Sequence, residues 1–191
     1  MWASLGVDLE RPLLVANLVN LVWRSRAASK REMVRALDAL RSQHGFQISF
    51  FCNECREGEM FDRAAAEEVK SKMERPAVMV PNYYWSPDEV VGLTTHAGVV
   101  VSQRYHFSIF AVLAGTVPVS ILRGCKMGGL VEDLGTPASC RIENVESERL
   151  LDDILEAHRN RSLYLDRLST PRRQLAIRAG NNLVYFRHHD R

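Results

Sequence analysis

The pentad Ser102-Gln103-Arg104-Tyr105-His106 places a guanidinium and an imidazole two residues apart, directly after an apolar run. An arginine fork binds carboxylate and phosphate groups through paired hydrogen bonds, and histidine can hold or deliver a proton near neutral pH. The pattern predicts an anion site in which Arg104 binds and His106 binds or acts as a general acid. The simpler alternatives are a surface ion pair for Arg104 and a packed imidazole for His106.

The strands and the helix predicted on either side of the pentad indicate its place in the fold. Residues 98–101 and 117–122 are apolar runs rich in β-branched residues, which is typical of parallel strands buried on both faces. Ligands of open parallel sheets bind at the carboxyl ends of strands, where helix N-termini offer free N–H groups and a positive dipole end. Apolar residues at helical spacing predict the crossover helix that starts at the pentad, and these are Phe107, Phe110, Ala111 and Ala114.

Further candidates follow other strands at the same predicted edge. Lys126 comes after the loop that ends the 117–122 strand, and a solvated lysine is its default alternative. Tyr84 and Trp85, next to Tyr83, follow a predicted strand over 77–80. Three adjacent aromatic residues cannot all face one core, so we expect at least one of them to line a cleft or an interface. Ser102 either binds substrate or caps the following helix.

Along the whole chain, strands and helices are predicted to alternate. This pattern predicts an α/β fold, a doubly wound and mostly parallel Rossmann-like sheet with long C-terminal helices laid across it. Residues 1–11 are expected to form a short polar leader and residues 12–191 a single domain. Pro171 is expected to kink or split the last helix, near 162–186. Strands are predicted at 13–19, 46–52, 77–80, 98–101, 117–122 and 139–142, and the other helices at 29–43, 61–73, 86–96, 104–114, 126–134 and 146–159.

Composition limits the classes of function. Because 25 Lys and Arg residues are matched by 23 Asp and Glu residues, the net charge of +2 argues against nucleic-acid or polybasic membrane binding. No apolar run approaches the roughly 20 residues of a membrane helix, and the N-terminus lacks the pattern of a signal peptide, so we expect a cytoplasmic protein. The four cysteines are expected to be free thiols. Cys52 and Cys55 have redox or zinc spacing but no second close pair, so no metal site is predicted.

The pentad also belongs to a longer pattern. It resembles the C-terminal signature of the polysaccharide pyruvyl transferases over roughly 12–187, most densely over 99–135. Two departures are that two residues separate Gly115 from Pro118 where one is usual, and that Tyr105 replaces a common leucine. The resemblance implies the donor-binding, C-terminal half of a GT-B-like enzyme, with the N-terminal acceptor half absent or supplied by a partner chain. The matching residues are Ser102, Arg104, His106, Ala111, Ala114, Gly115, Pro118, Lys126, Leu134 and Gly135.

The resemblance further implies a transferase that moves pyruvate from phosphoenolpyruvate to two hydroxyls of a sugar, forming a ketal. The sugar would belong to a cell-surface polysaccharide or exopolysaccharide, or to its precursor. Arg104 and His106 would then be catalytic and substrate-binding, and Lys126 would belong to the donor site. Ser102, Tyr84 and Trp85 are the other substrate-binding candidates. Phosphoenolpyruvate is the donor substrate, and no metal or other cofactor is expected.

Two alternatives stay open at this point. A GT-B glycosyltransferase that uses a nucleotide sugar shares the small-residue helix and the turn that follows it. Such enzymes commonly place a carboxylate on that helix to bind ribose hydroxyls, and residues 107–118 contain no acidic residue. A non-catalytic half-domain that serves as an interaction module is the second alternative.

Overall fold

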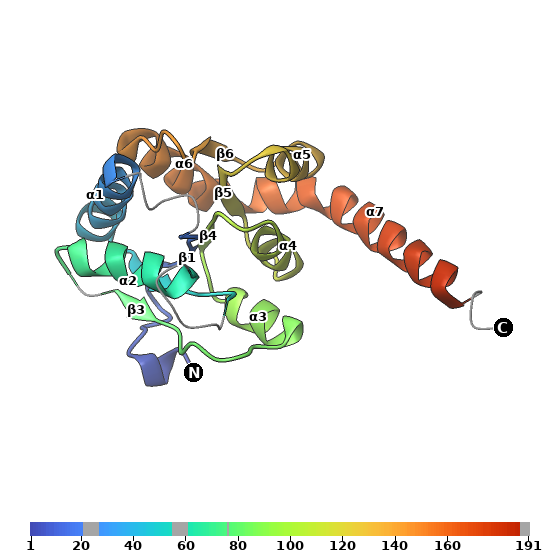
Figure 1. The fold of residues 1–191 in the computed structure, drawn as a ribbon, viewed down its shortest axis with the longest axis horizontal. Coiled ribbons are helices and arrows are strands. Elements are labelled where there is room, and N and C mark those ends of the chain that lie inside the picture. Colours follow the sequence, from blue (N-terminus) through green and yellow to red (C-terminus); the bar gives the residue numbers. More distant parts are fainter. Residues whose placement is uncertain (21–26, 55–60, 76, 188–191) are drawn as a thin grey trace.

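The computed structural model describes residues 1–20, 27–54, 61–75 and 77–187. Its strands form one six-stranded sheet in the order β3-β2-β1-β4-β5-β6, and all neighbouring strands run parallel. This confirms the predicted doubly wound, Rossmann-like sheet (Figure 1). The strands are β1 (Leu13–Asn17), β2 (Gln47–Phe50), β3 (Val78–Met79), β4 (Val99–Ser102), β5 (Pro118–Leu122) and β6 (Ala138–Arg141).

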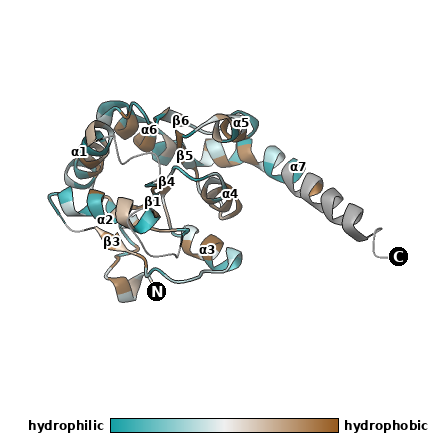
Figure 2. Cartoon of the chain, in the orientation of Figure 1, coloured by the Kyte–Doolittle hydropathy of each residue, from teal (hydrophilic) through white to brown (hydrophobic). Residues whose placement is uncertain are grey.

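Helices cover both faces of the sheet. One face carries α1 (Ala27–His44), α2 (Asp62–Lys72) and α6 (Ser147–Arg159), whose apolar residues share one core cluster with the strands. The other carries the short helix η1 (Ala3–Leu5), α3 (Pro87–Thr94) and α4 (Tyr105–Leu113). α5 (Cys125–Leu134) and α7 (Arg161–Arg187) pack together beside α4. Figure 2 shows apolar and polar residues interleaved on α1 and α6, as expected for helices with one buried side.

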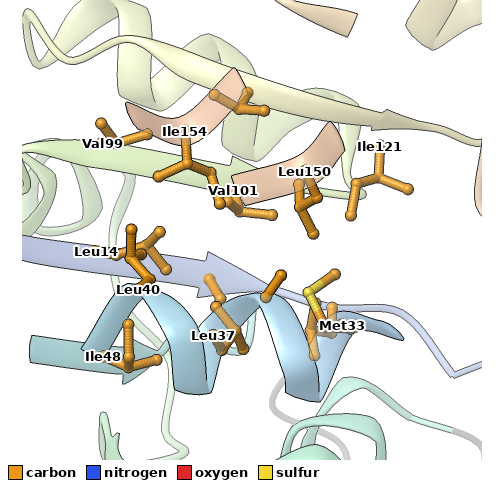
Figure 3. Packing of buried hydrophobic residues seen from close by; sticks show 14 of the residues in the cluster. Leu14, Met33, Leu37, Leu40, Ile48, Val99, Val101, Ile121, Leu150 and Ile154 are labelled. Atoms are coloured by element: carbon orange, nitrogen blue, oxygen red, sulfur yellow. The ribbon is translucent and has the colours of Figure 1, made fainter. Parts of the chain in front are cut away.

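The core forms where strand residues on one face meet the helices. Met33, Leu37 and Leu40 recur at helical spacing on α1 and point toward the sheet (Figure 3). Leu150 and Ile154 of α6 approach the same layer from the side of β4 and β5. All of these side chains are fully buried. Burial of each contributes on the order of 2 kcal/mol of transfer free energy.

The packed structure corrects the prediction for the first eleven residues and narrows the prediction for Pro171. The first eleven residues are not a detached polar leader, because Trp2 and Val7 are buried in the core cluster of the α3–α4 face. The Trp2 indole N–H also donates to the Leu93 carbonyl at 3.1 Å. Pro171 was expected to kink or split the last helix, and of these two outcomes the split is wrong, since α7 runs continuously through Pro171. The neighbouring Arg167 and Arg172 are exposed, so water can satisfy the backbone groups that the proline leaves unpaired.

The strand order reverses between β1 and β4. β1 is followed along the chain by elements that extend the sheet toward β3, and β4 by elements that extend it toward β6. Ligands of doubly wound sheets bind outside the carboxyl ends of the strands at such a reversal. Asn17 ends β1 and pairs in register with Ser102, the last residue of β4. The predicted pentad therefore begins at the reversal point.

None of the helices among residues 1–20, 27–54, 61–75 and 77–187 has the length and apolar character needed to cross a membrane.

Candidate functional site

Ser102 shapes the junction between β4 and α4. Its side chain is fully buried, and its hydroxyl accepts the Arg104 N–H at 3.1 Å and donates to the Arg104 carbonyl at 2.8 Å. Arg104 occupies the N-cap position of α4 with extended backbone angles. Ser102 thus fixes the turn that presents the next four residues, and substrate binding by this hydroxyl stays a prediction.

Arg104 has an anionic partner within the protein. Its Nε and Nη2 atoms donate to Asp62 Oδ2 and Oδ1, each at 2.7 Å, in a bidentate pair. The Asp62 side chain is 1% exposed, whereas that of Arg104 is 26% exposed. A cation at a helix N-terminus is disfavoured by the helix dipole, and the structure supplies a compensating anion from the first residue of α2. The ordinary ion-pair alternative for Arg104 is thus realised, although with a buried partner.

A second carboxylate and a second arginine lie near this pair. Glu54 Oε2 is 3.8 Å from Arg104 Nη2. Burial raises the pKa of Asp62 above its ordinary value, while the hydrogen bonds and charge of Arg104 and the charge of Arg123 oppose that rise. The side-chain hydrogen bonds of Arg104 with described residues use Nε and Nη2. Its Nη1 edge is therefore the part of the guanidinium on which an outside anion would bind.

His106 is exposed in the first turn of α4. Its ring meets the Tyr105 ring edge to face, with centroids 5.5 Å apart. The alternative of a packed imidazole is excluded by this exposure. The structure therefore brings Arg104 and His106 to the same helix N-terminus, where the first-turn N–H groups also lie.

A pocket of about 220 Å³ opens between the β4–α4 and β5–α5 junctions. Lys126, the second residue of α5, is exposed and lines this pocket, as the strand-edge argument predicted. Within the described residues, neither Lys126 nor Arg123 forms an ion pair. The pocket, called here the α5 pocket, is lined by Gln103, Tyr105, Arg123, Cys125, Lys126 and Met127.

Two buried amides mark the point where the strand order reverses. Gln103 Oε1 accepts the Val19 N–H at 2.9 Å, and Asn17 Nδ2 donates to the Phe51 carbonyl at 2.8 Å. In the described part of the chain, Gln103 Nε2 and Asn17 Oδ1 are buried without a hydrogen-bond partner. Such unpaired buried atoms are costly, so each calls for an explanation such as a bound ligand or water.

The aromatic residues after β3 form a second pocket at the same edge. Tyr84 is 74% exposed, and Trp85 is half-buried with its ring stacked on Tyr83 at 4.2 Å between centroids. The Trp85 indole N–H donates to the Pro81 carbonyl, which fixes the ring. This agrees with the expectation that these aromatics line a cleft. The pocket has a volume of about 130 Å³ and is lined by Phe51, Cys52, Asn53, Tyr83, Tyr84, Trp85, Pro87, Val90 and Phe110.

The cysteines do not form a metal or redox centre among the described residues. Burial raises the pKa of Cys52 to about 12, so this thiol is a poor nucleophile and a poor metal ligand. Cys55 lies outside the described residues. Cys125 is exposed at the start of α5, whereas Cys140 is buried. The described residues contain no cluster of three His, Cys, Asp or Glu side chains that could hold a metal ion.

Sequence reasoning missed the residues whose roles depend on distant partners. Asp62 is 42 positions from Arg104, and Gln103 is held by the backbone of Val19, 84 positions away. Asp62 could have been suspected, because it opens a helix that follows a strand and must start at the carboxyl edge. Nothing in the local sequence distinguishes Gln103 from a solvated residue.

Solved structures similar to this chain are enzymes with a GT-B-like fold. A UDP-forming α,α-trehalose-phosphate synthase from Burkholderia xenovorans has a TM-score of 0.62 at 13% identity, covering 94% of this chain and 45% of that one. A sucrose-phosphate synthase from Thermosynechococcus elongatus has a TM-score of 0.61 at 14% identity, covering 97% and 47%. A family 9 glycosyl transferase from Veillonella parvula has a TM-score of 0.55 at 10% identity, covering 86% and 49%.

These likenesses establish the fold, which is one Rossmann-like half of a GT-B architecture, and the chain spans less than half of each of those three structures. No curated protein matches the chain significantly. The model of the polysaccharide pyruvyl transferase family matches residues 14–123, which is more than half of the 191 residues and includes Ser102, Arg104 and His106. The chain therefore belongs to the polysaccharide pyruvyl transferase family.

Proposed function

We propose that this protein takes part in pyruvyl transfer from phosphoenolpyruvate to two hydroxyls of a saccharide. In this reaction both hydroxyl oxygens bond to the enol carbon, and inorganic phosphate leaves. One hydroxyl proton is balanced by the proton gained at the methylene carbon, which becomes a methyl group. The other hydroxyl proton leaves with the phosphate. The product is a cyclic pyruvate ketal on the sugar, in keeping with a family of transferases that modify polysaccharides.

The observation that carries the proposal is the position of the family motif. Arg104 and His106 sit together at the N-terminus of α4, at the carboxyl edge of the sheet and next to the reversal between β1 and β4. Lys126 lies at the start of the neighbouring α5. Phosphoenolpyruvate carries a phosphate and a carboxylate, so it needs two adjacent groups of donors, and two neighbouring helix N-termini provide them.

Each residue has a role that its surroundings support. Asp62 holds the Nε and Nη2 side of Arg104, so the Nη1 side is presented to the donor substrate. His106 is exposed and next to Arg104, so we assign it proton delivery to the methylene carbon or to the departing phosphate. Lys126 binds the second anionic group, and the buried hydroxyl of Ser102 keeps the Arg104 backbone in place. The chemistry requires no metal.

The acceptor side of the reaction is less complete in this chain. The exposed Tyr84 and the half-buried Trp85 offer an aromatic platform for a sugar ring. Because the chain spans less than half of the similar GT-B structures, we assign most of the acceptor contacts to an N-terminal half or a partner chain. A cytoplasmic location fits this proposal, since phosphoenolpyruvate is a metabolite of that compartment.

The test is titration calorimetry with phosphoenolpyruvate on the wild type and two matched histidine variants. His106→Asn should weaken binding by roughly 10- to 150-fold, because a contact to a charged group is worth about 1.5–3 kcal/mol. His96→Asn should leave binding unchanged, since His96 is exposed near the opposite, amino-terminal edge of the sheet beside Gly98. Equal affinity in both variants would remove His106 from the donor site.

The glycosyltransferase alternative predicts a different donor. A nucleoside diphosphate would then raise the melting temperature, because a ligand stabilises the folded state by mass action. The fold is shared with a synthase that is named as UDP-forming, but the family motif favours phosphoenolpyruvate. A melting temperature raised by uridine diphosphate and unchanged by phosphoenolpyruvate would overturn the proposal. If neither ligand changes the melting temperature, the non-catalytic interaction module is favoured.

A further inference from the structure

The α5 pocket has donors on several sides and no anion of its own. α5 starts after Gly124, whose positive φ of 97° and lack of a side chain leave the first turn without a side-chain cap. The first turn of α5 has no acidic residue. Arg123 and Lys126 are both exposed and both line the pocket. The free N–H groups and the helix dipole therefore act in the same direction as two cationic side chains.

Gln103 adds an independent observation. This residue is 1% exposed and lines the same pocket. Because a backbone N–H can only donate, the bond from Val19 identifies the bound atom of the carboxamide as Oε1. Nε2 is then a buried donor with no partner in the described structure. Val19 follows β1, on one side of β4, while the α5 pocket lies on the β5 side.

We propose that the α5 pocket binds a phosphate group, with Gln103 Nε2, the first N–H groups of α5 and Lys126 as donors. Gln103 is a substrate-binding residue in this assignment, and its carboxamide is oriented by the Val19 backbone. The inference rests on the proposed function in naming the phosphate as that of the donor substrate, which is released as inorganic phosphate. Arg104 then binds the carboxylate end of the same molecule.

Gln103→Glu is a sharp variant for this site. The glutamate keeps an oxygen acceptor for the Val19 N–H, so the structural role of the side chain is retained. It replaces the Nε2 donor by a second oxygen that repels an anion. Gln174→Glu is the matched control, because it makes the same change of charge at an exposed position of α7. Lys126→Ala is a second variant that does not touch the buried amide.

Cys125 provides a readout that does not depend on turnover. It is exposed and lines the pocket, so iodoacetamide, a neutral reagent, should alkylate it at a rate that falls when the pocket is occupied. The rate is followed by mass spectrometry of the Cys125 peptide, which separates this thiol from Cys52, Cys55 and Cys140. Inorganic phosphate, phosphoenolpyruvate and pyruvate are the three probes.

Phosphate and phosphoenolpyruvate should each slow alkylation of Cys125, and pyruvate should not. The phosphate concentration that gives half protection should rise at least tenfold in Gln103→Glu and in Lys126→Ala, and should be unchanged in Gln174→Glu. Absence of protection by phosphate, or equal protection in Gln103→Glu and Gln174→Glu, would overturn the assignment. If inorganic phosphate protects Cys125 and phosphoenolpyruvate does not, the phosphate site is supported and the proposed donor substrate is refuted.

Discussion

The two sides of β4 handle charge differently at the carboxyl edge. On the side of α2, Arg104 is held in a bidentate pair by the buried Asp62, with Glu54 nearby. On the side of β5, Arg123 and Lys126 are exposed around a pocket and form no ion pair with a described residue, although the charge of Arg123 still acts on Asp62. The first group is a preorganised part of the protein, whereas the second remains available to a ligand.

This contrast bears on how an arginine in a motif is interpreted. Arg104 is the residue that the sequence marks most clearly, yet two of its three nitrogens already serve the protein. A guanidinium fixed by a buried carboxylate loses little conformational entropy when it binds a ligand, so pairing with Asp62 improves the geometry of the site. The same pairing reduces the net charge that an anion meets there. The unpaired donors near α5 then supply the attraction.

The largest expected effect comes from removing Arg104, the less buried partner of the pair with Asp62. Arg104→Leu should lower the free energy of unfolding by about 3–5 kcal/mol, because it leaves a buried carboxylate without its counter-ion. The double variant Arg104→Leu with Asp62→Leu should recover most of that loss, since apolar replacement of a buried pair is often nearly neutral. Urea denaturation measures both. A double variant no more stable than the single one would show that the pair is not the cause.

A smaller loss is expected from the other partner. Asp62→Ala should cost about 1–3 kcal/mol, because the 26%-exposed Arg104 side chain can turn to water when its carboxylate is removed. Lys72→Ala on the same helix is the control. It removes the exposed Lys72–Glu68 pair, which should cost about 0.5 kcal/mol or less, because Lys30 still pairs with Glu68. Equal unfolding midpoints for the two variants would contradict the contrast between a buried and a surface pair.

The fold was largely predictable because its signals are local. The strands β4 and β5 were placed by short β-branched runs, and the helix between them by apolar residues at helical spacing. The helix predicted over 86–96 starts where expected, and Ser86 caps it in a capping box with Glu89. The predicted ends of the strands were less accurate. The first strand, expected to reach Val19, ends at Asn17, whose side-chain Nδ2 donates to the Phe51 carbonyl and to Asn53 Oδ1.

The site was predictable only in part. The edge of the sheet and the motif residues Arg104 and His106 followed from the order of elements. The contacts that decide their chemistry join residues far apart in sequence, such as Arg104 with Asp62 and Gln103 with Val19. Such pairs depend on the strand order and on helix positions, and a single sequence carries no local pattern that fixes them.

The pH dependence of stability tests whether burial or the pairing with Arg104 dominates the pKa of Asp62. Because burial raises its pKa above 3.8 in the folded state, the folded protein binds this proton more tightly than the unfolded chain does. The stability contributed by this group is therefore full below the unfolded pKa and is lost as pH rises through the folded pKa. The unfolding free energy of the wild type minus that of Asp62→Asn should fall as pH rises from 3.5 to 7. A rising difference would mean that Arg104 outweighs burial.

The smallest effect on stability is expected on the β5 side. Lys126→Ala should change the free energy of unfolding by less than about 0.5 kcal/mol, since an exposed side chain with no ion-pair partner among the described residues has little to lose. Its effect on ligand binding should nonetheless exceed its effect on folding, which is the reverse of Asp62→Ala. Urea denaturation and phosphoenolpyruvate calorimetry on the same two variants compare the two effects. If Lys126→Ala costs as much stability as Asp62→Ala, then Lys126 has a structural partner, and the division between a preorganised and an available side of β4 fails.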